Sequence, residues 1–286
     1  MKKIHLSIGK KYLILPVMAF ALAFTSCKKE EEMKEDPVKS NPSGETVPSS
    51  FTKKVMFEEF SGEWCGNCPD GVTYLDNMVA AHPGKVIIAS VHQGDPFAIS
   101  HYSTLNGFLN VTGFPRSAIN RTPAQGTSGG SQNGLLAYSR GNWSTNANRE
   151  LSKTAICGLK LETSVSGSNL SITVKCGANT SISGAKLTVY IVEDDVAESS
   201  PGAQAGAATG WKHKDLLRAC LTNGLGDDID LSSAELATKT YTADISSYTK
   251  ANVKVIAFIH KHKTSPNDYE ILNVQETHAG QTKNWD

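Results

Sequence analysis

The sequence lacks the residue patterns that would by themselves assign a metal or a haem. Its one C-x-x-C motif has no second C-x-x-C and no H-x₃₋₅-H pair to complete a structural zinc site. Pro69 follows the motif, where covalent haem attachment requires histidine. We therefore expect neither a metal nor another cofactor. After the N-terminal region, no apolar run is long enough to cross a bilayer.

An excess of one charge is also lacking. The chain of 286 residues has 28 Lys and Arg against 28 Asp and Glu. Residues 1–26 contain four lysines and no acidic residue, so the remainder has 24 basic and 28 acidic residues and a net charge of −4. Such a chain does not favour nucleic acid or an anionic membrane surface as a partner.

Residues 1–26 have the pattern of a bacterial lipoprotein signal peptide. Lysines precede the apolar segment 12–24, which is short and contains a proline, so a signal peptide fits better than a membrane span. Two small residues then precede Cys27, although Phe24 stands where leucine is usual. The pattern resembles a lipobox, which implies cleavage before Cys27 and lipid attachment to its sulfur. The alternative is an ordinary secretory signal with an incidental cysteine.

The most informative motif is the cysteine pair Cys65 and Cys68, which stands between an expected strand and an expected helix. Alternation over residues 54–60 predicts the strand, and apolar residues at helical spacing after Pro69 predict the helix. A helix N-terminus or a C-x-x-C context lowers the pKa of a thiol from about 8.5 to roughly 3.5–7.5. We expect Cys65 to be the nucleophile and Cys68 the resolving thiol. A static disulfide or an incidental pair is the alternative.

Three other side chains are candidates for the same site. Glu59 points inward if the strand is right, and a buried carboxyl there would carry the proton of Cys68; a solvent-facing strand residue is the alternative. Trp64 would shield the dithiol and pack beside it. His92 ends the second expected strand, where α/β sites gather, and is either a substrate contact or a satisfied loop histidine.

The patterns divide the chain into four segments. Residues 1–26 are the signal peptide, and residues 27–50 are the lipidated cysteine and a disordered tether, because they are charged and rich in Pro and Ser without apolar periodicity. Residues 51–153 alternate as β-α-β-α-β, which predicts an α/β layer fold. Residues 154–286 contain several short alternating strands, which predict an all-β sandwich domain. The elements expected in the α/β part are strands 54–60, 85–91 and 117–121, and helices after residue 68 and over 100–110.

Two further cysteines lie on a predicted hairpin in the second domain. A tight turn centred on Ser166 and Gly167 would place Cys157 opposite Cys176. In an oxidising compartment the two could form a cross-strand disulfide, and the alternative is that both are small buried side chains. Cys220 is then left over and is expected to be buried.

The segment Trp64–Cys68 is similar to the thioredoxin active-site motif, with Asn67 where thioredoxin has proline. Glu59 falls where thioredoxins carry a buried acid. Phe114 and Pro115 resemble the cis-proline loop that faces the dithiol. The resemblance implies that this loop and Trp64 bind the backbone of a partner chain, as an added strand would. The departure at Asn67 leaves the redox direction open.

Over residues 51–280 the chain resembles the Omp28-related outer-membrane lipoprotein family. The resemblance begins at the lipobox and is most specific in the block Glu59–Pro69. Weaker matches are Gly113–Pro115 with Ile119–Arg121, His213 with Leu217 and Arg218, and Val255–Ile259. It implies a thioredoxin-like domain followed by an immunoglobulin-like β domain, anchored by lipid in the outer membrane on its periplasmic or cell-surface side.

These observations favour a lipid-anchored thiol–disulfide oxidoreductase that acts on extracytoplasmic proteins with thiols or disulfides. The rival hypothesis, from another class, is a surface binding or structural lipoprotein that uses the thioredoxin-like fold as a non-catalytic scaffold. A peroxidase is not favoured, because the Thr- and Pro-lined pocket of a peroxidatic cysteine is absent from the motif.

Overall fold

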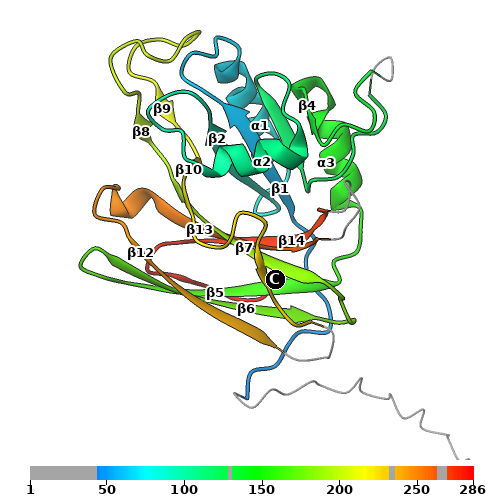
Figure 1. The fold of residues 1–286 in the computed structure, drawn as a ribbon. Coiled ribbons are helices and arrows are strands. Elements are labelled where there is room, and N and C mark those ends of the chain that lie inside the picture. The colour runs from blue at the N-terminus through cyan, green and yellow to red at the C-terminus, as the bar shows by residue number, and fades with distance from the viewer. Residues whose placement is uncertain (1–43, 128–130, 232–235, 263–268) are drawn as a thin grey trace, which may run out of the picture. The chain divides into compact units, whose positions relative to one another are not determined.

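The computed structural model describes residues 44–127, 131–231, 236–262 and 269–286 (Figure 1). The expected signal peptide and Cys27 lie outside these residues. None of the helices in the described part of the chain has the length and apolar composition of a membrane span.

Residues 55–151 fold as the sequence predicts, with strands and helices in alternation. The elements are β1 (Val55–Ser61), α1 (Cys68–Ala81), β2 (Val86–His92), α2 (His101–Leu109), β3 (Arg116–Ile119), β4 (Ala137–Tyr138), η2 (Arg140–Asn142) and α3 (Trp143–Leu151). β1 and β2 are parallel, and β3 and β4 are antiparallel to their neighbours. All residues of β1 and β2 are buried, as expected for central strands covered on both faces.

The regular elements of the described residues after Leu151 are almost all strands. They are β5 (Cys157–Ser166), β6 (Asn169–Ala178), β7 (Ala185–Glu193), β8 (Val196–Ala197), β9 (Lys212–His213), β10 (Leu216–Cys220), β11 (Asp227–Asp228), β12 (Ala237–Asp244), η3 (Lys250–Asn252), β13 (Val253–Lys261), β14 (Ile271–His278) and β15 (Thr282–Lys283). The chain is thus a mixed α/β protein with many strands and few helices.

One large sheet runs through both halves of the chain, in the order β14-β13-β7-β10-β2-β1-β3-β4. β10 joins the halves: Leu216 lies opposite Ser90 of β2 on one side and opposite Glu193 of β7 on the other. The predicted division between residues 153 and 154 therefore does not coincide with a break in the sheet.

Three apolar clusters hold the layers together. α1 and α3 cover one face of β1 and β2, with Leu75, Met78 and Trp143 as the main helix contacts. α2 covers the other face through Leu105 and Leu109. A second sheet, in the order β12-β6-β5-β15, packs against β7 and β13 around the largest cluster, so two layers of strands face each other in the lower part of Figure 1.

The hairpin of β5 and β6 has a register that differs by two residues from the prediction. Cys157 lies opposite Ala178, and Cys176 lies opposite Leu159. The turn consists of Gly167 and Ser168, with Gly167 at φ +61°, because glycine supplies the positive φ that a two-residue turn needs at its first position. A two-residue shift preserves the face of every side chain, so both cysteines are buried as expected, but neither is in a disulfide.

Residues 44–50 do not behave as the free tether that the sequence predicts. Glu45 forms ion pairs with Lys160 and Lys175 on the second sheet. Val47 lies against Gly177, where any side chain would collide with it. These contacts are long-range in sequence, so the composition of the segment does not reveal them.

A buried ion pair in the first half, together with a tyrosine from the second, connects the two halves on the α2 side. The Arg121 guanidinium donates two hydrogen bonds of 2.7 Å to the Glu58 carboxylate, and the Tyr190 hydroxyl donates a third of 2.8 Å. Burial opposes the charge on Glu58, but Arg121 and the hydrogen bonds outweigh it and lower the pKa of the carboxyl. The rings of Phe108 and Phe258 lie 5.1 and 5.0 Å from the guanidinium.

We expect Arg121→Met to lower the free energy of unfolding by about 3–5 kcal/mol, because it leaves the buried Glu58 carboxylate without its partner. Replacing both residues with methionine should recover most of this loss. Guanidinium unfolding monitored by circular dichroism measures both. Arg140→Met is the matched control, because the Arg140–Asp70 pair is on the surface and should contribute less than about 1 kcal/mol. A loss in Arg121→Met no larger than in this control would contradict the role of the pair.

Candidate functional site

The cysteine pair lies where the sequence predicts it, between the end of β1 and the start of α1. Cys65 and Cys68 form a disulfide with Cα atoms 5.4 Å apart. Both are buried, Cys65 with 5% of its surface exposed and Cys68 with 1%. Cys68 is the first residue of α1 and is followed by Pro69, which needs no hydrogen-bond acceptor at this position. This is the oxidised form of a dithiol held at a helix N-terminus.

The expected aromatic and proline residues lie beside the disulfide. Trp64 is 48% exposed, and its indole N–H donates a 2.7 Å hydrogen bond to the Gln93 carbonyl. Its ring meets that of Phe114 edge to face at 4.9 Å. The Phe114–Pro115 peptide is cis, and Pro115 packs against Gly71 in the first turn of α1. A Cβ on Gly71 would lie 3.0 Å from the Pro115 ring, so glycine permits this close approach.

Glu59 is fully buried, so the prediction that it points inward is confirmed. The Ser90 hydroxyl donates a 2.7 Å hydrogen bond to Oε2, while Oε1 has no hydrogen-bond partner among the described residues. Burial raises the pKa of this carboxyl to about 7, against the opposing effects of Ser90 and His92. Glu59 is therefore poised to gain or lose a proton near neutral pH.

A small cavity of about 10 Å³ lies beside Cys68. This is the size needed for a single water molecule. Ser90 lines it, and through its hydroxyl the cavity is linked to Glu59. The remaining polar side chains on its wall are Ser61, His92, Gln204, His213 and Lys214.

A loop from the second half of the chain, residues 198–210, covers one side of the motif. The Gln204 side chain donates a 3.2 Å hydrogen bond to the Cys65 carbonyl, and the Ala205 N–H donates one of 2.7 Å to the Glu63 carbonyl. Gly206 has φ +77°, and a Cβ there would collide with the Gly66 carbonyl. The sequence shows an Ala- and Gly-rich loop here, but nothing in it indicates what the loop contacts.

Two buried histidine–carboxylate pairs anchor this loop and the end of β2. His92 Nδ1 donates a 2.6 Å hydrogen bond to Asp95. His213 lies 3.4 Å from the Glu63 carboxylate, which also accepts hydrogen bonds from the Ser199 N–H and hydroxyl. The two imidazole rings meet edge to face at 4.8 Å. The sequence singles out His92 alone of these, because only His92 ends an expected strand.

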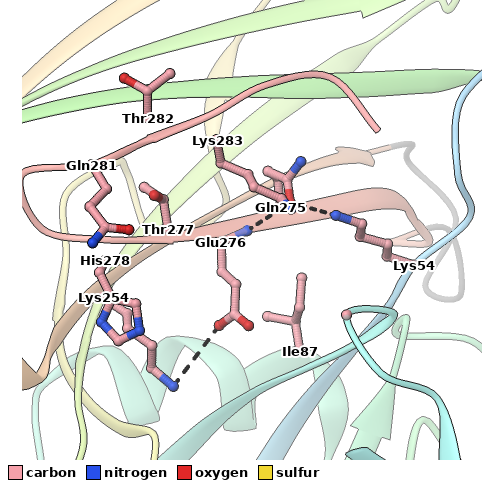
Figure 2. A pocket seen from close by; sticks show the side chains of 11 residues that line it. Lys54, Ile87, Lys254, Gln275, Glu276, Thr277, His278, Gln281, Thr282 and Lys283 are labelled. Atoms are coloured by element: carbon pink, nitrogen blue, oxygen red, sulfur yellow. Dashed lines mark hydrogen bonds and ion pairs between the residues drawn. The ribbon is translucent and has the colours of Figure 1, made fainter.

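A separate cavity of about 220 Å³ lies between Lys54, β14 and the C-terminal strand (Figure 2). Glu276 points toward Lys254, and Gln275 faces Lys54. Its lysines are paired with carboxylates, Lys54 with Asp286 and Lys254 with Asp194 and Asp215. None of the sequence-predicted site residues lines it. Nowhere in the described ranges are three His, Cys, Asp or Glu side chains grouped so that they could hold a metal ion.

One solved structure, that of HBP35, supports the fold. HBP35 of Porphyromonas gingivalis superposes with a TM-score of 0.69 at 20% identity, over 80% of this chain and 76% of that protein. A protein from Agrobacterium tumefaciens gives 0.49 at 15% identity, over 82% and 98%. A domain of the outer membrane lipoprotein Omp28 from Porphyromonas gingivalis gives 0.30 at 15% identity, over 44% and 89%.

Comparison with sequence families is more specific. No curated protein matches the chain significantly. The model of the family of outer membrane protein Omp28 matches residues 102–283, which is more than half of the chain. The chain therefore belongs to the Omp28 family, and this confirms both the family and the outer-membrane location that the sequence predicts.

Proposed function

We propose that this protein is a lipid-anchored thiol–disulfide oxidoreductase that acts on extracytoplasmic proteins through Cys65 and Cys68. The observation that carries the proposal is the position of this pair at the N-terminus of α1. Pro115 packs against the first turn of the same helix, at Gly71. The buried Glu59 carboxyl is linked through Ser90 to the cavity beside Cys68. The signal peptide of residues 1–26 and the lipid on Cys27 belong to the proposal as well.

The fold supports a thioredoxin-like assignment for residues 51–153. The parallel strands β1 and β2, the antiparallel β3 and β4, and helices on both faces follow the thioredoxin order. β10 supplies the strand on the far side of β2. The second sheet faces the β7 and β13 part of the large sheet, and these two layers of strands support an immunoglobulin-like assignment for residues 154–286.

In this mechanism the Cys65 thiolate attacks a sulfur of the partner's disulfide, and the partner's other sulfur leaves with the electron pair of the broken bond. Cys68 then loses its proton and attacks the Cys65 sulfur, which releases the partner's remaining thiolate and forms the Cys65–Cys68 disulfide. The partner is reduced by two electrons and the dithiol is oxidised. Glu59, through Ser90 and the cavity, accepts the Cys68 proton.

The surroundings determine the side from which a partner approaches. The loop 198–210 closes one side of the motif. Trp64 is exposed and Phe114 half-buried, and their rings pack together into an apolar surface that is accessible to solvent. We therefore assign partner binding to Trp64, Phe114 and Pro115, where an extended segment can lie against the loop that precedes β3.

One observation favours the rival hypothesis of a binding or structural lipoprotein. Cys65 is only 5% exposed, and the loop 198–210 is hydrogen-bonded to its carbonyl. A disulfide sealed in this way would be a static crosslink, and the thioredoxin-like fold would then be a scaffold.

The reduction potential of the Cys65–Cys68 pair decides between these functions. We expect a value between about −270 and −120 mV, the range of working oxidoreductases. The full chain in detergent is equilibrated in glutathione buffers and trapped by alkylation, and mass spectrometry then follows the tryptic peptide 55–85. This peptide contains only these two cysteines, so the other thiols do not interfere. A potential below about −300 mV would identify a structural disulfide and favour the rival function.

Glu59→Gln should make the oxidised protein more stable at high pH. The folded protein keeps the Glu59 proton up to about pH 7, whereas the unfolded chain loses it near the ordinary value of 4.5. Between these values the folded state binds the extra proton, so wild-type stability falls as the pH rises. We expect Glu59→Gln to exceed the wild type by about 2–3 kcal/mol at pH 8 and to equal it near pH 4. Unfolding in guanidinium at both pH values measures this difference.

The neighbouring carboxyl is the matched control. Glu58 has a lowered pKa because Arg121 and its hydrogen bonds outweigh burial, so Glu58→Gln should lose stability at pH 8. Glu59→Gln should also slow the attack of Cys68 at pH 7, because it removes a proton acceptor. A Glu59→Gln protein that is less stable than the wild type at pH 8 would show that the carboxyl is not raised in pKa.

A further inference from the structure

The wall of the cavity beside Cys68 also contains His92, which has no role in the proposed mechanism so far. We propose that His92, oriented by Asp95, is a second proton carrier for Cys68, alongside Glu59. This inference rests on the proposed oxidoreductase function and adds a residue to its site.

The strand register places His92 on the same wall as Ser90. The two residues are two apart on β2, so both side chains leave the same face of the sheet. Opposite them on β1 are Glu59 and Ser61. Ser90, His92 and Cys68 all line the cavity, so one water molecule there could bridge the thiol to either group.

Asp95 determines which nitrogen of the His92 imidazole carries the hydrogen, that is, its tautomer. Its Oδ2 accepts the 2.6 Å hydrogen bond from His92 Nδ1 and one of 2.8 Å from the Glu63 N–H, and its Oδ1 accepts one of 2.9 Å from the Phe97 N–H. Burial opposes the charge on Asp95, but the His92 bond and the backbone N–H groups outweigh it and lower the pKa of the carboxyl. An ionised carboxylate only accepts, so Nδ1 keeps its hydrogen and Nε2 is the nitrogen that exchanges a proton.

The other charged and titratable groups around His92 favour this role for it. Its ring faces His213, and burial together with the neighbouring His92 lowers the pKa of His213, which keeps that imidazole neutral. Glu63 pairs with His213, Glu59 lies across the strand pair, and Lys214 lines the cavity. Of the two histidines, His92 lies closer to its carboxylate, 2.6 Å from Asp95, than His213 does to Glu63, at 3.4 Å.

With the partner held on Cys65 in a mixed disulfide, the Cys68 thiol passes its proton through the cavity to His92 Nε2. The Cys68 thiolate attacks the Cys65 sulfur, the bond between Cys65 and the partner breaks, and the partner leaves as a thiolate with the electron pair. In the opposite direction His92 returns the proton to Cys68 as the Cys65–Cys68 bond opens. Trp211 and Lys214, at the surface end of the cavity wall, give the imidazole a route to solvent.

The test separates the two chemical steps with a chromogenic aromatic disulfide, DTNB. The reduced full chain in detergent releases one thionitrobenzoate when Cys65 attacks and a second when Cys68 displaces the mixed disulfide. A Cys65→Ser/Cys68→Ser protein records the release caused by the other thiols. We expect His92→Gln to slow the second release about threefold at pH 6.5 and to leave the pH dependence of the remaining carrier, Glu59. The first release should stay within about twofold of the wild type.

Two further variants make the outcome specific. Asp95→Asn should slow the second release in the same way, because an amide no longer holds Nδ1 as the protonated nitrogen. His101→Gln is the matched control, since His101 is a buried histidine bonded to the Tyr190 hydroxyl and does not line the cavity. It should leave both releases within about twofold.

Each outcome of the experiment leads to a different conclusion. If the wild type gives no second release, the proposed function fails. If the wild type gives it and His92→Gln has the same rate and pH profile, the function stands and the inference is overturned. Equal slowing of both releases in His92→Gln and Asp95→Asn also overturns it, because His92 would then only hold the loop in place. Should His92→Gln not fold, Asp95→Asn decides by the same criteria.

Discussion

The buried cluster of Glu58, Arg121 and Tyr190 is the interaction on which the arrangement of the two halves depends. Glu58 comes from the central strand β1, Arg121 from the turn after β3, and the third partner, Tyr190, from β7. A buried carboxylate without its cation is strongly destabilising, so these three elements have only one favourable arrangement. Arg121 reaches Glu58 from a left-handed backbone conformation at φ +52°, which L-residues seldom adopt and which the ion pair maintains.

Glu58 and its neighbour Glu59 are both buried carboxyls, but their surroundings give them different pKa values and different roles. Glu58 and Glu59 are consecutive on β1 and point to opposite faces of the sheet, one toward α2 and the other toward Ser90. Both are fully buried, yet the pKa of Glu58 is lowered by its guanidinium partner and that of Glu59 is raised to about 7 by burial without a cation. The paired carboxylate stabilises the fold, and the unpaired one is available for proton transfer.

Local patterns in the sequence were sufficient to predict part of the fold and part of the candidate site. The alternation of strand and helix up to residue 153, the position of Cys65 and Cys68 and the burial of Glu59 all follow from neighbours within a few residues. The hairpin register was predicted two residues away from the observed one, because Ser166–Gly167 and Gly167–Ser168 are both plausible turns and both bury the same face. The insertion of β10 beside β2 and the contacts of loop 198–210 depend on residues far apart in sequence, which local patterns do not reveal.

The contacts of loop 198–210 also affect the access of a partner protein to Cys65 and Cys68. Gln204, Ala205 and Gly206 contact the backbone of the motif itself, from Glu63 to Gly66. Backbone contacts of this kind do not depend on the side chains at positions 66 and 67, so the loop tolerates the departure from the thioredoxin sequence at Asn67. The side of the motif that the loop covers is not free for a partner, whereas the Trp64 ring, which packs against Phe114, remains 48% exposed. The second half of the chain therefore shapes the access to a site whose reactive residues all come from the first.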